Sequence, residues 1–323
     1  MSAAGRILDG KATAAEIRAE VQAGVSELIA AGGRRPGLAV VLVGDNPASK
    51  VYVASKARAC EEVGMLGRTV RLPATAAAAE LEAAVDALNA DDEIDGFLVQ
   101  LPRPDGLPER AILERIDPDK DADGFHPVNV GRLWTGEPGF VPATPSGIVE
   151  LLRRHRVELR GARAVVVGRS NIVGKPMAAL LLREHATVTV CHSRTRDLPG
   201  VCGEADVLVA AIGRAAMIGS EYVREGAVVV DVGMNRVAEL SEVERLYPDD
   251  AGRLAAFVDK GSILVGDVDF THVRPKAAAI TPVPGGVGPL TVAMLLVNAL
   301  AASRRRQGIA PGGGAGAGKG AAA

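Results

Sequence analysis

The chain has 323 residues, enough for two domains that each bury a core, and with only 3% aromatic residues those cores must be built from aliphatic side chains. The formal net charge of −2 excludes the basic excess typical of nucleic-acid binding, and the three cysteines lack the spacing of a metal or redox site. The chain has neither an apolar run of roughly 20 residues, as a bilayer span needs, nor a secretory signal, so we expect a cytoplasmic protein without nucleic-acid or membrane partners.

The first third of the chain alternates between short apolar runs and helix-like periodicity. The apolar runs predict strands over 38–43, 69–72 and 96–101, and the periodic segments predict helices over 48–63 and 77–89. Such alternation is typical of a mainly parallel sheet covered by helices. The following segment, 102–145, is rich in Pro, Gly and Asp and has weak periodicity, so we expect a functional loop region there.

A second α/β series begins after a helix that we expect over 146–156. Its apolar runs predict strands over 164–167, 187–191, 207–211 and 228–232. Residues 237–260 form a polar, helix-like segment that looks inserted before a short apolar run at 263–265. An apolar helix is expected over 290–301, and the Gly- and Ala-rich tail 307–323 is expected to be disordered.

A glycine turn after the strand 164–167 is a candidate dinucleotide site. The residues Gly168-Arg169-Ser170-Asn171-Ile172-Val173-Gly174 precede a helix that opens near Pro176. A strand, a glycine turn and a helix N-terminus in this order bring backbone N–H groups to a pyrophosphate. The spacing departs from G-x-G-x-x-G, since Ser170 replaces the second glycine and Gly174 comes one residue late. The turn alone is therefore equally compatible with an ordinary strand-to-helix connection.

The end of the next strand favours NADP over NAD. An NAD site usually has a carboxylate there, which binds the ribose hydroxyls. This chain has Ser193, Arg194, Thr195 and Arg196 instead, and Arg169 offers a further cation. Hydroxyl and guanidinium groups suit a 2′-phosphate. A solvated loop is the alternative for either Arg194 or Arg196 alone, whereas the combination predicts NADP.

Tyr52 and Lys56 are four residues apart, so on a helix they share one face, and Ser49 lies close to that face. Taken alone, the pair is better explained by a surface lysine beside a half-buried tyrosine. Short-chain dehydrogenases also use a Y-x-x-x-K pair, but there it follows the glycine turn within one domain. Here it precedes the turn by more than a hundred residues, which excludes that family.

Three further features accompany this pair. Gln100 lies at the carboxyl end of the strand 96–101, and such ends face ligand crevices in open α/β sheets. Asp123 lies within the loop-rich segment. Residues 281–291 (TPVPGGVGPLT) are too rich in glycine and proline for a strand or helix and suit a close backbone approach to a ligand.

At these residues the chain resembles the bifunctional methylenetetrahydrofolate dehydrogenase/cyclohydrolase (FolD) family. The matching motifs come in the family's order and span about residues 5 to 303: VGDNPASKVYVASKARACEEVGM (43–65), VQLPRP (99–104), DKDADGFHPVNVGRL (119–133), VVGRSNIVGKPMA (166–178), DVGMNR (231–236) and TPVPGGVGPLTVAMLL (281–296). The resemblance implies an α/β fold with two domains around a cleft. An N-terminal α/β catalytic, folate-binding domain is expected over 1–146, completed by a C-terminal helix at 287–306, and a Rossmann-type NADP-binding domain over 147–286.

The resemblance also implies two reactions, oxidation of 5,10-methylenetetrahydrofolate with NADP and hydrolysis of the resulting methenyl cation to 10-formyltetrahydrofolate. Lys56 is then the central catalytic group, Tyr52 stacks on or orients the folate, Gln100 hydrogen-bonds near Lys56, and Asp123 binds the pterin edge. Folate contacts are implied at Tyr52, Val99, Gln100, Leu101, Asp123, Pro282, Gly285, Gly286 and Pro289. NADP contacts are implied at Gly168, Arg169, Ser170, Gly174, Ser193 and Met234. The family also implies a homodimer.

The chemistry of hydrolysis is consistent with these residue types. A lysine can accept and donate protons near neutral pH only if its pKa is lowered toward neutrality, and both burial and a cationic folate lower that pKa. Gln100 can hold the amine without restoring its high pKa, as a carboxylate would. His126 and His192 are expected to be structural, and no metal cluster is evident. Two departures from the family are Ala122, where Val is usual, and the insertion 237–260. The first is a packing change with little chemical meaning. The second lengthens a short hairpin-like connection of the family, and any effect is expected at the edge of the cofactor domain or at a dimer contact.

Three alternatives remain open from the sequence. The enzyme could keep only one activity, although Lys56, Gln100 and Asp123 together favour both. An NADP dehydrogenase for an amino acid or a hydroxy acid would share the cofactor domain but would not need the motifs at 99–104 and 281–291. A non-catalytic NADP-binding regulator would bind the cofactor without turnover.

Overall fold

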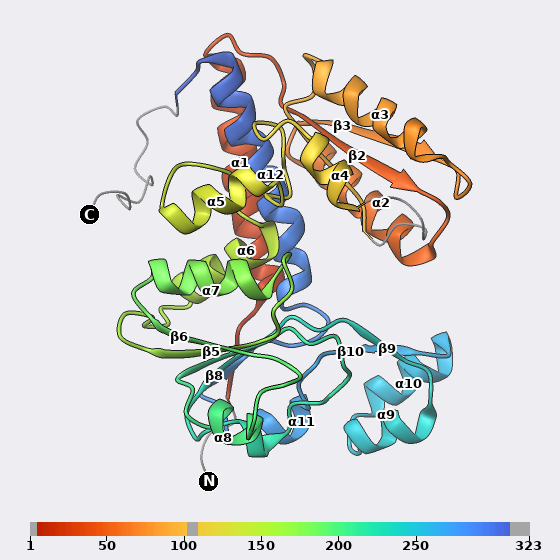
Figure 1. Ribbon diagram of the computed structural model, residues 1–323. Helices are drawn as coiled ribbons and strands as arrows, with labels where there is room; N and C mark the ends of the chain where they lie inside the picture. Colours follow the sequence, from red (N-terminus) through yellow and green to blue (C-terminus); the bar gives the residue numbers. More distant parts are fainter. Residues whose placement is uncertain (1–4, 102–108, 311–323) are drawn as a thin grey trace. The chain divides into compact units, whose positions relative to one another are not determined.

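The computed structural model describes residues 5–101 and 109–310, which form two compact units (Figure 1). One unit contains the described residues of 1–13 and 144–291, and the other contains those of 14–143 and 292–323. We call them the six-stranded unit and the three-stranded unit after their main sheets. The domain division expected from the sequence differs from these units chiefly at residues 1–13, and it stays a prediction.

The three-stranded unit is built on a parallel sheet of β2 (Gly37–Val43), β3 (Leu66–Leu72) and β4 (Gly96–Val99), in the order β3-β2-β4. All residues of β2 are buried, as its continuous apolar run predicts for a central strand. The helices α2 (Pro47–Glu62) and α3 (Ala78–Ala90) follow β2 and β3. Leu81, Val85 and Leu88 of α3 pack on Phe97 and other sheet residues to form the core. The predicted strands, helices and parallel pairing are confirmed here.

The segment 102–145 is less irregular than the sequence suggests. It contains α4 (Glu109–Arg115) and α5 (Pro127–Thr135), and α6 (Ala143–Arg154) begins before the predicted position 146. Because α4 and α5 are short, neither shows a clear periodicity. The ring Nδ1 of His126 accepts the N–H of Val128 at 3.1 Å and caps α5, the structural role expected of it. The prediction of loop between 102 and 108 lies outside the described residues.

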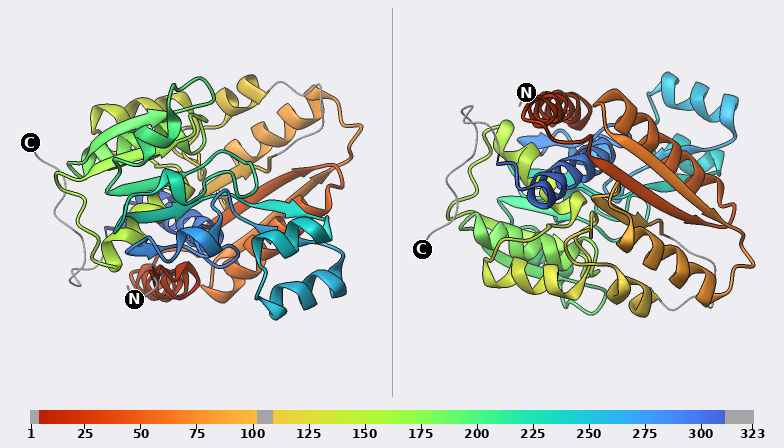
Figure 2. Two further views of the ribbon diagram at one scale, coloured as in Figure 1. Left: turned by 90° about the horizontal axis from the view of Figure 1, so that it is seen from below. Right: turned by 90° about the horizontal axis from the view of Figure 1, so that it is seen from above.

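Two long helices complete the three-stranded unit, α1 (Gly10–Ala30) from residue 14 on and α12 (Val287–Gln307) from residue 292 on. They run side by side (Figures 1 and 2), and Arg304 donates to the Gly24 carbonyl at 3.2 Å. Among the described helices, α12 alone is long and apolar enough to cross a membrane by length and composition. The expectation that no segment meets this length and composition is therefore wrong for α12. However, 56% of its most apolar window is buried in the protein, which is the pattern of a core helix.

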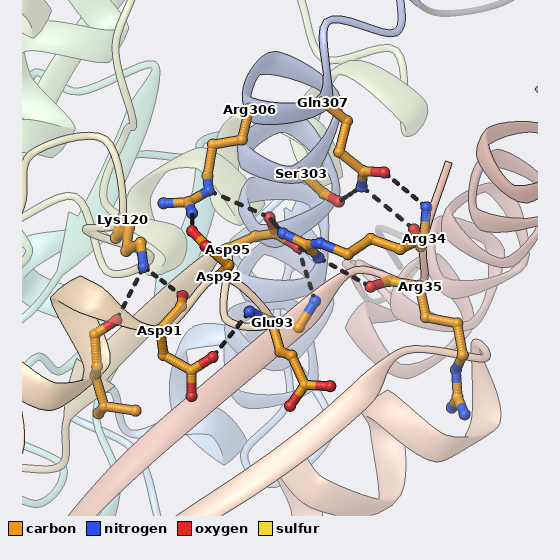
Figure 3. Close-up of polar contacts among 12 residues, drawn as sticks. Arg34, Arg35, Asp91, Asp92, Glu93, Asp95, Lys120, Ser303, Arg306 and Gln307 are labelled. Atoms are coloured by element: carbon orange, nitrogen blue, oxygen red, sulfur yellow. Dashed lines mark hydrogen bonds and ion pairs between the residues drawn. The ribbon is translucent and has the colours of Figure 1, made fainter. Parts of the chain in front are cut away.

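A polar network fixes the end of α12 to the start of β4 (Figure 3). Asp95 is fully buried and accepts two N–H groups of the Arg34 guanidinium, at 2.8 and 2.6 Å, and the Gly37 N–H at 2.9 Å. Arg306 lies 3.6 Å from the same carboxylate. The Gln307 amide bonds both the N–H and the carbonyl of Arg34. The last turn of α12 is therefore ordered to residue 307, whereas the tail 311–323 lies outside the described residues.

The six-stranded unit has a Rossmann-type parallel sheet in the order β1-β11-β8-β7-β5-β6. Its strands are β1 (Arg6–Ile7), β5 (Arg163–Val167), β6 (Thr187–Cys191), β7 (Val207–Ala210), β8 (Val228–Asp231) and β11 (Ala279–Ile280). Besides most of α6 and the inserted helices described below, this unit contains the helices α7 (Gly174–Arg183), α8 (Leu198–Cys202) and α11 (Phe270–Val273), with a 3-10 turn at Ser220–Tyr222. The chain runs from β5 to β6 on one side and later to β7 on the other. The topological switch point, where such sheets bind ligands, is therefore at the carboxyl end of β5.

The insertion 237–260 is helical, as its pattern predicts. It lies between β9 (Asn235–Val237) and β10 (Ile263–Val265), which pair antiparallel, and contains α9 (Leu240–Leu246) and α10 (Ala251–Lys260). The two helices and the hairpin lie together in every view (Figures 1 and 2). They share a small core whose buried members are Val237, Val243, Leu246, Tyr247, Ile263 and Val265.

Candidate active site

In the three-stranded unit, Lys56 of α2 meets Gln100, which directly follows β4. Its Nζ donates to Oε1 of Gln100 at 2.9 Å. The Gln100 Nε2 donates to the Leu101 carbonyl at 2.6 Å, which turns the amide oxygen toward the lysine. Because β2 and β4 are adjacent parallel strands, the start of α2 and the end of β4 lie at the same edge of the sheet. The structure thus brings together two residues that the sequence singled out separately.

Lys56 is not a surface lysine, since only 5% of the residue is exposed. Burial lowers its pKa, and the nearby carboxylate of Asp123 acts in the opposite direction. Gln100 carries no charge, so the hydrogen bond holds the amine without adding to that opposing field. The site is therefore suited to a lysine that exchanges protons nearer to neutral pH than a solvated one does.

Asp123 is carried to this edge by a short extended segment beside β4. Phe97 donates its N–H to the Lys120 carbonyl at 2.8 Å, and Ala122 donates to the Phe97 carbonyl at 3.2 Å. Asp123 follows at once and remains half-buried. Burial raises the pKa of its carboxyl to about 6, Lys56 opposes this, and Asp121 adds to it. Its carboxylate and the amine of Lys56 thus influence each other electrostatically.

The turn after Asp123 depends on Asp121, a residue that the sequence analysis passed over. Its buried carboxylate accepts the N–H groups of Gly124, Phe125 and His126, at 3.1, 3.2 and 2.9 Å. Gly124 has φ +72°, and a Cβ there would lie 2.6 Å from the Val141 carbonyl carbon, so only glycine fits. An aspartate shortly before a glycine is a turn signal that could have indicated this role.

Tyr52 lies one helical turn before Lys56, is half-buried, and burial raises the pKa of its phenol. Ser49, one turn earlier, is only 3% exposed, and its hydroxyl has no hydrogen-bond partner among the described residues. The predicted face of the helix is therefore formed. Val99 is buried in β4 and Leu101 is half-buried just after it.

In the six-stranded unit, the predicted glycine turn connects β5 to α7, which begins at Gly174 rather than near Pro176. Gly168 has φ +134°, and a Cβ would lie 2.2 Å from the Ala211 carbonyl oxygen. A Cβ on Gly174 would lie 2.1 Å from the Gly168 oxygen, so both positions require glycine. At the position of the missing second glycine, the Ser170 hydroxyl accepts the N–H groups of Val173 and Gly174 and so stabilises the turn.

The other expected cofactor residues lie at the same carboxyl edge of the sheet. Ser193, Arg194 and Arg196 are exposed after β6, Arg169 is exposed after β5, and Met234 is 44% exposed after β8. His192 accepts the Arg194 N–H at 3.1 Å and so shapes the loop. Three arginines and a serine hydroxyl in one region are donors that fit the phosphate groups of NADP.

The glycine- and proline-rich segment follows β11 and therefore lies at this same edge. The Thr281 hydroxyl accepts the Asp231 N–H at 2.7 Å, and Lys11 donates its N–H to the Gly285 carbonyl at 3.0 Å. Among the described residues, no group of three His, Cys, Asp or Glu side chains could hold a metal ion.

Comparison with known proteins decides the family. The family model for the tetrahydrofolate dehydrogenase/cyclohydrolase catalytic domain matches residues 8–123. The model for the NAD(P)-binding domain of the same family matches residues 142–307. The chain belongs to this family.

Close relatives are similar over nearly the whole chain. The bifunctional protein FolD of Solibacter usitatus is 53% identical over 304 residues, which cover 94% of this chain and 99% of that protein. The FolD enzyme of Campylobacter jejuni, a solved structure, has a TM-score of 0.85 and 45% identity, covering 94% of this chain and all of that one. The Trypanosoma brucei enzyme, solved with NADP and an inhibitor, has a TM-score of 0.85 and 40% identity, with coverage of 94% and 99%.

Membership of the tetrahydrofolate dehydrogenase/cyclohydrolase family confirms the resemblance, the α/β fold class and the enzyme class predicted from the sequence. The protein is a dehydrogenase and cyclohydrolase of tetrahydrofolate derivatives, not an amino-acid or hydroxy-acid dehydrogenase. The roles of individual site residues stay predictions.

Proposed function

We propose that this protein oxidises 5,10-methylenetetrahydrofolate with NADP and then hydrolyses the methenyl product to 10-formyltetrahydrofolate. The observation that carries the proposal is the buried Lys56, held by the neutral amide of Gln100 at 2.9 Å in the electrostatic field of Asp123. The NADP bound to the Trypanosoma brucei relative and the basic loop residues of this chain support the cofactor.

For the dehydrogenase step, the six-stranded unit supplies the cofactor groups. Gly168, Arg169, Ser170 and Gly174 would hold the pyrophosphate, Ser193 and the neighbouring arginines the 2′-phosphate, and Met234 a flat ring of the cofactor. NADP, when bound, supplies the hydride acceptor. The protein's own task is alignment of the two reactants, because hydride transfer needs little proton chemistry from side chains.

For the cyclohydrolase step, Lys56 acts as the general base and then as the general acid. In its neutral form the amine accepts a proton as water adds to the methenyl carbon. Returning that proton to the folate N5 then lets the bond between this nitrogen and the carbon break. The hydroxyl group on the carbon loses its remaining proton to solvent as the C=O bond forms, which leaves the formyl group on N10. The lowered pKa makes the amine available near neutral pH, and Gln100 keeps it directed at the substrate.

The remaining residues position the folate. Asp123 offers two acceptor oxygens to adjacent donors of the pterin, and Tyr52 offers a ring to stack on it. Val99 and Leu101 flank Gln100 and would contact the substrate from the end of β4. The loop residues Pro282, Gly285, Gly286 and Pro289 would lie along it.

A single assay tests the proposal. The protein is mixed with methylenetetrahydrofolate and NADP, and the absorbance of NADPH and of methenyltetrahydrofolate is followed. NADPH should accumulate while the methenyl signal rises only transiently. Stable accumulation of the methenyl compound would mean that only the dehydrogenase is present. Cofactor binding with no change in either signal would indicate a non-catalytic protein and contradict the proposal.

We further propose a cytoplasmic homodimer, since the composition favours a cytoplasmic protein and the family resemblance implies a dimer. Sedimentation velocity on the purified chain would give twice the mass of one chain if this is correct. A single species at the 33.2 kDa mass of one chain would contradict it.

A further inference from the structure

Arg253 of α10, one of the two inserted helices, reaches the loop that follows β11. Its Nη1 donates to the Leu264 carbonyl of β10 at 3.0 Å, and its Nη2 donates to the Val283 carbonyl. Leu264 belongs to the hairpin of the insertion, whereas Val283 belongs to the segment 281–286. One guanidinium thus bridges the insertion and the loop.

Contacts within the insertion hold the side chain and the backbone of Arg253 in place. The guanidinium lies over the ring of Tyr247, 4.7 Å from its centroid, and Tyr247 itself is only 7% exposed in the small core of the insertion. The N–H of Arg253 is capped by the Asp250 carboxylate at 3.0 Å, which fixes the first turn of α10. A planar group held by stacking and two carbonyls loses little entropy per bond formed, and lysine cannot reproduce this geometry.

The loop needs anchors from outside itself. Pro282 and Pro284 have no N–H, so this segment cannot form a regular hydrogen-bond ladder of its own. At its far end Lys11 donates to the Gly285 carbonyl at 3.0 Å, and a Cβ on Gly10 would lie 1.7 Å from the Gly286 oxygen, so α1 begins in direct contact with the loop. At its start, Thr281 is buried and bonded to Asp231. Arg253 anchors the peptide between these two ends.

We infer that Arg253 is a positioning residue for folate, through which the insertion sets the position of the loop 282–286. The inference rests on the proposed function, because that function places this loop along the substrate. Arg253 does not touch the reacting atoms. Its effect is to hold the Val283 carbonyl, so that the surfaces of Pro282, Gly285 and Gly286 are preorganised before the substrate arrives.

The test compares Arg253→Met with Arg245→Met. Arg245 lies on α9 of the same insertion and is largely exposed, and its described ion pair and hydrogen bonds are to Glu242. Arg245→Met therefore removes the same charge as Arg253→Met without removing a bond to the loop. Arg253→Met should raise the KM for methylenetetrahydrofolate about tenfold and weaken tetrahydrofolate binding in calorimetry about tenfold. The Kd for NADP should stay within about twofold, and Arg253→Lys should recover part of the loss. Arg245→Met should match the wild type.

Two results would overturn the inference. One is that Arg253→Met lowers the melting temperature but leaves tetrahydrofolate binding unchanged, which is the outcome of a purely structural bond. The other is that Arg245→Met weakens folate binding equally. The loss in affinity would then come from the lost positive charge of the insertion and not from the bond to Val283. Calorimetry measures binding without turnover, so the comparison of the variants tests the role of Arg253 even if the protein proves inactive. A wild-type protein that binds tetrahydrofolate but has no catalytic activity would contradict the proposed function alone.

Discussion

The Nζ of Lys56 and the Oε1 of Gln100 lie 2.9 Å apart although the residues are separated by 44 positions in the chain. The hydrogen-bond partner of this buried amine is a neutral amide and not a carboxylate. A carboxylate at this distance would stabilise the ammonium form, whereas the amide accepts its hydrogen bond without adding a charge. This choice of partner explains how burial can lower the pKa of Lys56 while the side chain stays in a fixed direction.

Gln100→Glu should therefore slow hydrolysis near neutral pH. A carboxylate in contact with Lys56 raises the pKa of the amine, so the fraction in the neutral, proton-accepting form falls about tenfold for each pKa unit. The pH–rate profile of methenyltetrahydrofolate hydrolysis should show its rising limb displaced to higher pH. Gln100→Met removes the hydrogen bond without adding charge and serves as the control. An unchanged limb in Gln100→Glu would mean that Lys56 is not the titrating group.

Asp123→Asn should make the protein more stable and less active. The pKa of Asp123 is about 6 in the folded protein, above the ordinary carboxyl value, so the folded state binds this proton more tightly than the unfolded chain does. The contribution of the protonated Asp123 carboxyl to the free energy of unfolding is fully present below about pH 4 and is lost as the pH rises through about 6. Above pH 6 the variant should unfold at higher denaturant, by about 1–3 kcal/mol, while folate binding weakens. A variant less stable than the wild type at pH 8 would contradict this assignment.

The arginines after β6 are predicted to select NADP. The double variant Arg194→Ala/Arg196→Ala should raise the KM for NADP about 10- to 100-fold, since hydrogen bonds to a charged phosphate are lost. The KM for NAD should change little. Arg183→Ala, at the other end of α7, removes an exposed positive charge away from the carboxyl edge and is the matched control. An equal increase in the KM for NADP and for NAD in the double variant would contradict the assignment of these arginines to the 2′-phosphate.

Asp95 is predicted to stabilise the three-stranded unit without a part in catalysis. It is fully buried and bonded to Arg34 and the Gly37 N–H, so Asp95→Asn leaves Arg34 without its charge partner (Figure 3). We expect a loss of about 1.5–3 kcal/mol in the free energy of unfolding, measured by urea denaturation, because hydrogen bonds to a charged group are lost while Arg34 keeps access to solvent. Asp92→Asn, at a fully exposed side chain that pairs with Arg306, should leave the free energy of unfolding close to the wild-type value, because solvent screens this ion pair. A loss of similar size in both variants would show that burial is not the cause.

Much of the scaffold follows from the sequence because its signals are local. The apolar runs at β2, β4, β5 and β7 have continuous burial on both faces, which only a central parallel strand provides. The face shared by Tyr52 and Lys56 follows from helical spacing, and Gln100 and Asp123 were singled out by their positions after a strand and in a turn-rich segment. The depth of Lys56 could not be read from periodicity, because α2 has no strongly apolar face around it.

What the sequence could not indicate depends on contacts between distant segments. The short helices α4 and α5 have too few turns for a periodic pattern, and α5 depends on a cap from His126. Asp267 accepts the N–H groups of Ile212, Gly213 and Arg214, more than fifty residues earlier, and this pairing has no signature in either segment. The contact of Arg253 with Val283 is of the same kind, since it depends on how the inserted hairpin folds back.

The most direct test of the account is hydrolysis of 5,10-methenyltetrahydrofolate by Lys56→Met, beside Lys50→Met on the same helix. Lys50 is exposed and pairs with Asp45, so its loss should leave hydrolysis at the wild-type rate. Lys56→Met should fold, bind NADP within about twofold of the wild-type Kd, and lose at least about a hundredfold in the rate of hydrolysis. A Lys56→Met variant that hydrolyses the methenyl compound at the wild-type rate would contradict the account.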